Sequence, residues 1–130
     1  VGQVVAESEF PITRDSLVRY AGASGDFNPI HYREDVAKQV GLPGVLAHGM
    51  LTMGLSIQPV IAWLEGKGEV VDYSVRFTKP VVVPPQGEAV VSVVATVAAL
   101  DEENSRVRVD LTTTFEGNTV LGKAQAWVKF

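Results

Sequence analysis

The stretch SGDFNPIH, residues 24–31, carries the groups best suited to acid–base chemistry. It places Asp26 five residues before His31, in a chain that has only two histidines and no cysteine. A carboxylate and an imidazole are a common acid–base pair near neutral pH. Taken alone, the stretch also has a structural interpretation, because Asn28-Pro29 is a turn signature. In that interpretation Asp26 forms the turn or caps a helix, and His31 packs at its end.

The second histidine lies in Ala47-His48-Gly49-Met50, at the start of an apolar segment. The first N–H groups of a helix have no partner within the helix, so they stabilise negative charge. A glycine at such a place also lets a ligand approach the backbone closely. A thioester carbonyl on the Gly49 N–H would become more negative as the adjacent carbon gains or loses a proton, and such a donor typically contributes about 3–4 kcal/mol. Asp26 and His31 would then act on the water or hydroxyl of the neighbouring carbon.

The second half of the chain predicts an antiparallel sheet, because its apolar residues recur with period two. The alternating segments are residues 69–79, 91–99, 107–115 and 120–130. In the first of them, Val71, Tyr73, Val75 and Phe77 share the face expected to be buried. Glu116-Gly117-Asn118 is typical of a tight hairpin.

The first half predicts an edge strand over residues 4–10 and helices that cover the sheet. Thr13 is expected to be the N-cap of a helix that Gly22 and Gly25 end. A short helix is expected over residues 34–40, before Gly41.

The segment from Leu46 to Leu64 is apolar on nearly every side, which is typical of a buried helix. Pro59 is expected to shorten or kink it, because proline removes one helical hydrogen bond. The predicted fold is therefore α+β, with one long central helix wrapped by a curved antiparallel sheet of about five strands. Residues 1–130 are expected to form a single domain.

Composition excludes several kinds of function. A net charge of −4 argues against binding to nucleic acid or anionic membranes. The longest apolar-rich segment, residues 50–64, falls short of the roughly 20 residues that span a bilayer. The absence of a signal sequence and of cysteine fits a cytoplasmic location.

Residues 20–31 and 47–50 together resemble the hydratase motif of the MaoC-like dehydratases, which are hot-dog-fold (R)-specific enoyl-thioester hydratases. Residues 13–18, 49–54 and 73–78 are similar to the catalytic chain of the heterodimeric (3R)-hydroxyacyl-ACP dehydratases, which act in type II fatty acid synthesis of mycolic-acid-producing bacteria. The likeness covers most of the chain. It implies a hot-dog fold and the dehydration of (3R)-3-hydroxyacyl thioesters to trans-2-enoyl thioesters, with the reverse hydration.

The resemblance also implies roles for individual residues. Asp26 and His31 would be the catalytic pair, and the Gly49 N–H would be the oxyanion donor. Asn28 would orient the loop that carries the pair. His48 would support the site beside the oxyanion donor.

Substrates and partners follow from the same resemblance. The substrate would be an acyl-ACP or an acyl-CoA, with no cofactor beyond the pantetheine arm of the carrier. Arg76 and Lys79 would contact an acidic carrier or the CoA phosphates, or would simply form a solvated strand face. A homodimer or a heterodimer with a related hot-dog subunit is expected, since the sheet leaves an edge to pair. Pro59 would affect the depth and shape of the acyl tunnel.

Other functions stay open on the sequence. The enzyme could be an (R)-specific enoyl-CoA hydratase of fatty acid degradation or polyester supply, or the chain could be a non-catalytic acyl-binding partner in a hot-dog heterodimer. A metal site built from Asp26, His31 and His48 has thin support, because its ligands come from separate segments, and no metal is expected. A serine hydrolase is disfavoured, since Ser24 does not lie in a Gly-x-Ser-x-Gly elbow.

Overall fold

A computed structural model describes residues 1–130 and contains one antiparallel sheet. Its strands are β1 (Val4–Ile12), β2 (Glu69–Phe77), β3 (Ala89–Asp101), β4 (Arg106–Phe115), β5 (Asn118–Thr119) and β6 (Leu121–Lys129). The five long strands follow the order β1-β3-β4-β6-β2, and the short β5 pairs with β4. The first strand in the chain is therefore an edge strand, as predicted, and β2 forms the other edge.

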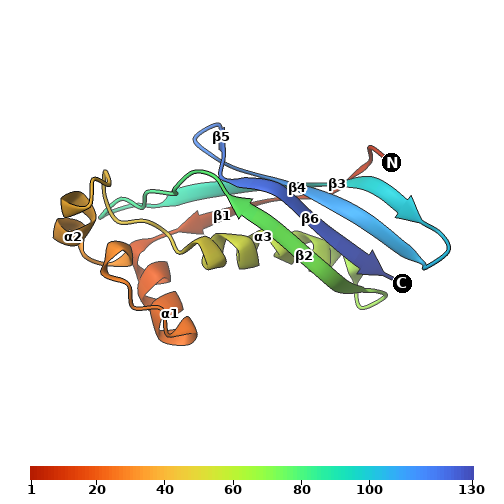
Figure 1. The fold of residues 1–130 in the computed structure, drawn as a ribbon, viewed down its shortest axis with the longest axis horizontal. Helices are drawn as coiled ribbons and strands as arrows, with labels where there is room; N and C mark the ends of the chain where they lie inside the picture. The colour runs from red at the N-terminus through yellow and green to blue at the C-terminus, as the bar shows by residue number, and fades with distance from the viewer.

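Four helical elements accompany the sheet. They are α1 (Arg14–Ser24), a single 3₁₀ turn η1 (Pro29–His31), α2 (Glu34–Gln39) and α3 (Gly49–Leu64). Figure 1 shows α3 lying along one face of the sheet, with α1 and α2 gathered at the end near the start of α3. The predicted α+β architecture, one long helix against about five antiparallel strands, is confirmed. No helix is both long enough and apolar enough to cross a membrane.

Local signals explain where the helix α1 begins and ends. The Thr13 side chain accepts a hydrogen bond from the Ser16 N–H at 3.3 Å, and the Ser16 hydroxyl accepts one from the Thr13 N–H at 3.1 Å. This reciprocal cap satisfies two N–H groups that a helix start leaves free. Gly25 ends the helix with φ 78°, a left-handed conformation that favours glycine. Gly22, expected to help end it, lies within the helix instead.

The long helix α3 differs from its prediction in two ways. It begins at Gly49 with His48 as N-cap, whereas Leu46 forms an isolated antiparallel bridge with Val82. It also continues through Pro59 to Leu64, so the proline does not shorten it. Proline removes one backbone hydrogen bond, and the remaining bonds and the packing of this buried residue hold the helix together.

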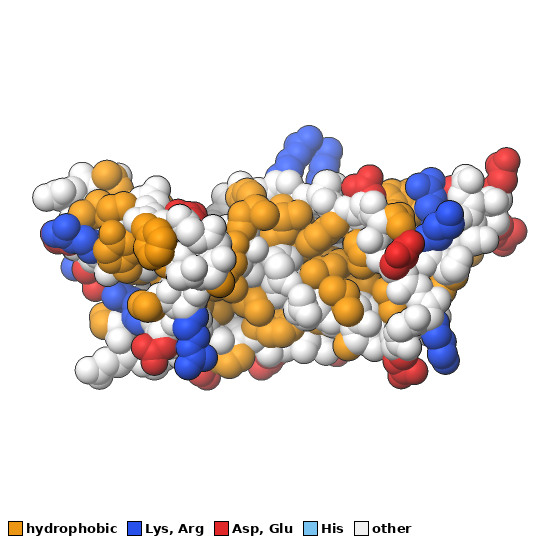
Figure 2. Space-filling model, turned by 90° about the horizontal axis from the view of Figure 1, so that it is seen from below, with side chains coloured by type: hydrophobic (Ala, Val, Ile, Leu, Met, Phe, Trp, Pro, Cys, Tyr) orange, Lys and Arg blue, Asp and Glu red, His pale blue; other side chains and the backbone are white.

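The expectation that α3 is buried on all sides is wrong for the chain by itself. Met50 and Ile61 are 58% and 48% exposed, because the sheet covers only one side of the helix. Seen from that side, hydrophobic side chains gather across the middle of the molecule (Figure 2).

The strand β2 also departs from its predicted alternation. Val71 and Phe77, both expected to be buried, are 45% and 56% exposed. The pairing of β2 with β6 shifts register between Val70 and Asp72 and again between Ser74 and Arg76. Bulges of this kind re-aim side chains and increase the twist of a strand, so the period-two rule fails here.

The core lies between α3 and the sheet, and it includes one polar link. The inward residues of β3, among them Val91, Val93 and Ala95, are almost completely buried. The Thr113 hydroxyl on β4 donates to Ser56 Oγ on α3 at 3.0 Å, and Ser56 donates to the Thr52 carbonyl at 2.7 Å. This buried pair fixes the helix against the sheet below the site.

Candidate active site

The loop after α1 is shaped by its own polar side chains. Ser24 Oγ accepts a hydrogen bond from the Asp26 N–H, and Asp26 Oδ1 accepts one from the Asn28 N–H, both at 3.1 Å. Asn28 Oδ1 in turn accepts from the Ile30 N–H at 3.3 Å and caps the turn η1. Each bond reaches two residues along the chain, as serine and Asx turns do. The motif therefore folds on itself, and Asn28 lies within the loop that carries Asp26 and His31.

His31 is held by the backbone of the segment before α3. Its Nδ1–H donates to the Leu46 carbonyl at 2.8 Å, and the Leu46 N–H donates back to the Ile30 carbonyl at 3.1 Å. A carbonyl can only accept, so Nδ1 carries the proton and Nε2 of the neutral ring keeps a free lone pair. His31 is 9% exposed. An imidazole fixed in this tautomer can take a proton through Nε2.

His48 contacts both members of the Asp26–His31 pair. Its Nε2–H donates to the Asp26 carbonyl at 3.2 Å. Its ring stacks on His31 with a centroid distance of 3.9 Å and an interplanar angle of 20°, and Tyr20 meets it edge-on at 4.7 Å. Burial lowers the pKa of His48, and the neighbouring His31 lowers it further, against the opposing effect of its hydrogen bond to Asp26. A neutral His48 thus braces the pair.

Gly49 supplies the first N–H of α3, and no side chain caps that end of the helix. It lines a surface hollow of about 430 Å³ together with Asp26 and His31. We call this hollow the dyad hollow, and its other lining residues are Leu46, Ala47, Met50, Phe77, Thr78, Lys79 and Pro80. Arg76, predicted alongside Lys79 as a carrier contact, does not line it.

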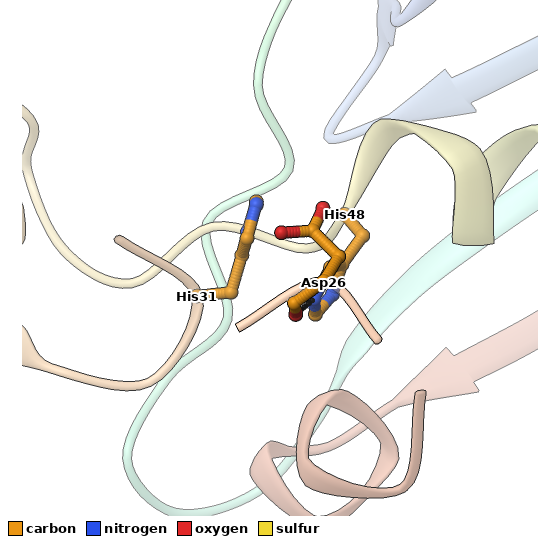
Figure 3. A group of neighbouring side chains, drawn as sticks. All are labelled: Asp26, His31 and His48. Carbon is orange, nitrogen blue, oxygen red and sulfur yellow. Dashed lines mark hydrogen bonds between the residues drawn. The ribbon is translucent and has the colours of Figure 1, made fainter. Parts of the chain in front are cut away.

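The acid and the imidazole are close enough to share one small molecule. A carboxylate oxygen of Asp26 and one ring nitrogen each from His31 and His48 lie within 4.8 Å of one another, and Figure 3 shows the Asp26 carboxylate beside the His31 ring. A water or hydroxyl makes hydrogen bonds of about 2.7–2.8 Å, so it can bridge two groups at this separation. The predicted grouping of Asp26, His31 and Gly49 around one space is therefore what the structure contains.

The same cluster is poorly arranged for a metal ion. A histidine ligand holds its metal about 2.0–2.1 Å from nitrogen, and the lone pair lies in the plane of the ring. The His31 and His48 rings are nearly parallel, with centroids 3.9 Å apart. One ion cannot lie in both planes, so the donor set does not fit a metal without rotating a ring.

Two features of the site were not found from the sequence. Phe77 lines the dyad hollow, although its position in β2 predicted a core residue. The Leu46 carbonyl, which sets the tautomer of His31, carries no sequence signal because any residue type provides a carbonyl. Tyr20 was part of the quoted motif but had no assigned role.

Comparison with known proteins agrees with the fold and the motif. The MaoC like domain family matches residues 1–115. A 3-hydroxyacyl-thioester dehydratase X of Mycobacterium tuberculosis is 46% identical over 74 residues, 56% of this chain and 25% of the relative. An (R)-specific enoyl-CoA hydratase of Rhodospirillum rubrum is 34% identical over 119 residues, 90% of this chain and 80% of the relative.

Solved structures give the same result. A MaoC-like dehydratase superposes with a TM-score of 0.94 at 38% identity, covering 100% of this chain and 40% of that one. A (3R)-hydroxyacyl-ACP dehydratase complex of Mycobacterium tuberculosis has a TM-score of 0.76 at 17% identity, covering 98% of this chain and 95% of that chain, a likeness that shows the fold alone. The chain thus spans a quarter of the mycobacterial thioester dehydratase and less than half of the MaoC-like dehydratase.

Fold and site together define a hot-dog domain with an acid–imidazole pair at the N-terminus of its central helix. The match over residues 1–115 then identifies the family: the chain belongs to the MaoC-like domain proteins. The relatives named above are dehydratases and hydratases of acyl thioesters.

Proposed function

We propose that this chain catalyses the reversible dehydration of (3R)-3-hydroxyacyl thioesters to trans-2-enoyl thioesters in fatty acid metabolism. The observation that carries the proposal is the dyad hollow, in which Asp26, His31 with its free Nε2, and the uncapped Gly49 N–H meet. The names of the two relatives describe the same reaction in its two directions.

The roles follow from the chemistry that each group offers. The thioester carbonyl accepts a hydrogen bond from the Gly49 N–H, which stabilises the negative charge that develops on its oxygen. His31 Nε2 takes the proton from C2, and the electron pair left behind forms the C2=C3 bond. The hydroxyl leaves C3 as water with the proton that His31 returns. Asp26 accepts a hydrogen bond from that hydroxyl and orients it, so both groups leave from the same face.

The other two named residues act through the pair. His48 holds the Asp26 backbone and the His31 ring, and Asn28 holds the loop between them. Both are positioning residues in this proposal. Lys79 lies at the wall of the dyad hollow, where an ammonium group suits the phosphates or acidic residues of a carrier, whereas Arg76 has only its nearby strand position to support such a role.

Type II fatty acid elongation on an acyl carrier protein is the metabolic setting we favour. The 46% identity to a mycobacterial thioester dehydratase supports it. An (R)-specific enoyl-CoA hydratase of degradation or polyester supply is the second candidate, supported by the relative that the chain matches over most of its length. Turnover of acyl-ACP against acyl-CoA substrates distinguishes the two.

A non-catalytic acyl-binding role is the third candidate, and the site argues against it. Such a role needs an acyl cavity but no aligned acid and imidazole. Here the tautomer of His31 and the shape of the loop are both fixed by hydrogen bonds. Groups held in this way favour the catalytic role.

A second hot-dog chain is part of the proposal. Asp26 is exposed, and three large apolar side chains around it and the dyad hollow, Phe27, Met50 and Phe77, are 61%, 58% and 56% exposed. Covering them would exclude water and strengthen the electrostatic interactions of the site. Whether the partner is an identical or a related chain is decided by sedimentation of the purified protein alone and with candidate partners.

Residues 1–130 act as one MaoC-like hot-dog domain in this proposal. The strand β6 lies beyond the matched residues and yet pairs with both β4 and β2. A cytoplasmic location stays a prediction.

The test is hydration of crotonyl-CoA and of long-chain enoyl thioesters by the purified chain, alone and with candidate partners. Asp26→Asn and His31→Ala are each expected to lower kcat by about 10²–10⁴-fold, the usual contribution of general acid–base catalysis. Glu69→Gln, at the far end of β2, is a control that should leave turnover unchanged. Chelator treatment should have no effect, given the parallel rings. Wild-type turnover that survives both dyad substitutions would reject the enzyme.

A further inference from the structure

One contact in the dyad hollow is not explained by the roles given above. A Cβ atom built on Gly49 would lie 2.9 Å from Phe77 Cδ1, 2.9 Å from Cε1 and 3.3 Å from Cζ. The Phe77 ring therefore fills the space directly beside the α-carbon whose N–H is the candidate oxyanion donor. A side chain at position 49 is excluded by this ring, apart from any ligand.

Core packing does not account for the position of Phe77. The residue is the last of β2 and is 56% exposed, so much of its ring faces the hollow or solvent. Its neighbour along the chain, Thr78, continues the wall of the hollow. A large aromatic ring held at an open site, against a backbone donor, contacts whatever that donor binds.

The position of the ring limits the shape of a bound thioester. A carbonyl oxygen hydrogen-bonded to the Gly49 N–H lies about 2.9 Å from the nitrogen, so the atoms attached to that carbonyl carbon come within van der Waals reach of Phe77. Those atoms are the sulfur and C2. The sulfur leads to the carrier arm and needs an open path. The space that the ring closes is therefore the space beside C2.

We propose that Phe77 is a specificity-determining residue that excludes substrates with a branch at C2. The proposal rests on the proposed function, since it assigns the thioester carbonyl to Gly49. It predicts a preference for straight-chain enoyl thioesters and a defined way of relaxing it. Replacing Phe77 by alanine opens the space beside C2 without touching Asp26 or His31.

The experiment compares kcat/KM for crotonyl-CoA and for its 2-methyl analogue. Added or missing methyl-sized groups in a tight pocket change such ratios by about 10–200-fold. Phe77→Ala is expected to raise the ratio of 2-methyl to unbranched substrate about tenfold over wild type. A rise of about threefold or more supports the assignment, and a smaller change overturns it. A purely structural role, or one in contact between subunits, would lower both rates together and leave the ratio unchanged.

Phe130→Ala is the matched control, because Phe130 is also a phenylalanine and is 55% exposed, but it does not line the dyad hollow. Its ratio should equal that of wild type. A second readout does not need turnover: Gly49→Ala should lower Tm through its clash with the ring, and adding Phe77→Ala should restore it. If wild type is inactive while Tm is restored, the proposed function fails but the ring contact stands. If activity is normal and neither the ratio nor Tm responds, only the role of Phe77 fails.

Discussion

The buried hydroxyl pair between α3 and β4 gives a quantitative test of how the helix is held. Ser56 and Thr113 are both 0% exposed, and each has the other as a hydrogen-bond partner across the core. Ser56→Ala leaves the Thr113 hydroxyl buried without an acceptor, which costs about 1–3 kcal/mol of the free energy of unfolding. Thr113→Val removes the donor but leaves Ser56 bonded to the Thr52 carbonyl, so it should cost about 1 kcal/mol or less.

The double variant should be less destabilised than the sum of the two single variants, because no unsatisfied hydroxyl remains. A coupling energy of about 1 kcal/mol is expected, within the range for residues in contact. Urea unfolding of the four proteins of the cycle, monitored by circular dichroism, measures it. Thr112→Val on the exposed face of β4 is the control and should change stability by less than about 0.5 kcal/mol. Strictly additive losses would refute the idea that this pair acts as a unit.

Three further predictions follow from single groups. Burial raises the pKa of Tyr73 to about 12, and its hydroxyl donates to the Met53 carbonyl at 2.6 Å; absorbance titration should show one tyrosine ionising near pH 12, and stability should fall as pH rises from about 10 to 12 unless Tyr73 is replaced by Phe. The pKa of His48 is lowered from 6.5 in the folded state, so its contribution to stability is complete above pH 6.5 and is lost as pH falls through the lowered value; His48→Phe should flatten this part of the pH profile in urea titrations. Thr13→Ala removes the reciprocal cap with Ser16 and should lower the free energy of unfolding by about 1 kcal/mol, whereas Thr13→Ser should retain most of it.

Much of the fold was predictable because its signals are local. The alternation in β3 and β4, the Thr13 cap and the Gly25 stop each act within a few residues, and the structure confirms all of them. The bulges in β2 and the exposed side of α3 were not predictable. They arise from how β2 pairs with β6 and from how much of the helix one sheet can cover, and no short segment of sequence encodes either.

The candidate site divides in the same way. Asp26, His31 and Gly49 were grouped from two motifs, and the structure brings them to one hollow. Their catalytic roles remain predictions. Phe77 was misplaced, because its contact with Gly49 joins distant parts of the chain through tertiary packing. Period-two alternation assigned it to the core, and only the register shifts in β2 reveal otherwise.

The dyad loop is tied to the segment before α3 and to its first residues, and none of its hydrogen bonds reaches β3, β4 or β6. Reactivity and thermal robustness therefore belong to different parts of this chain. An engineer could redesign the far strands for heat resistance while leaving the reacting groups untouched, and could graft variants of residues 24–50 onto one hardened scaffold.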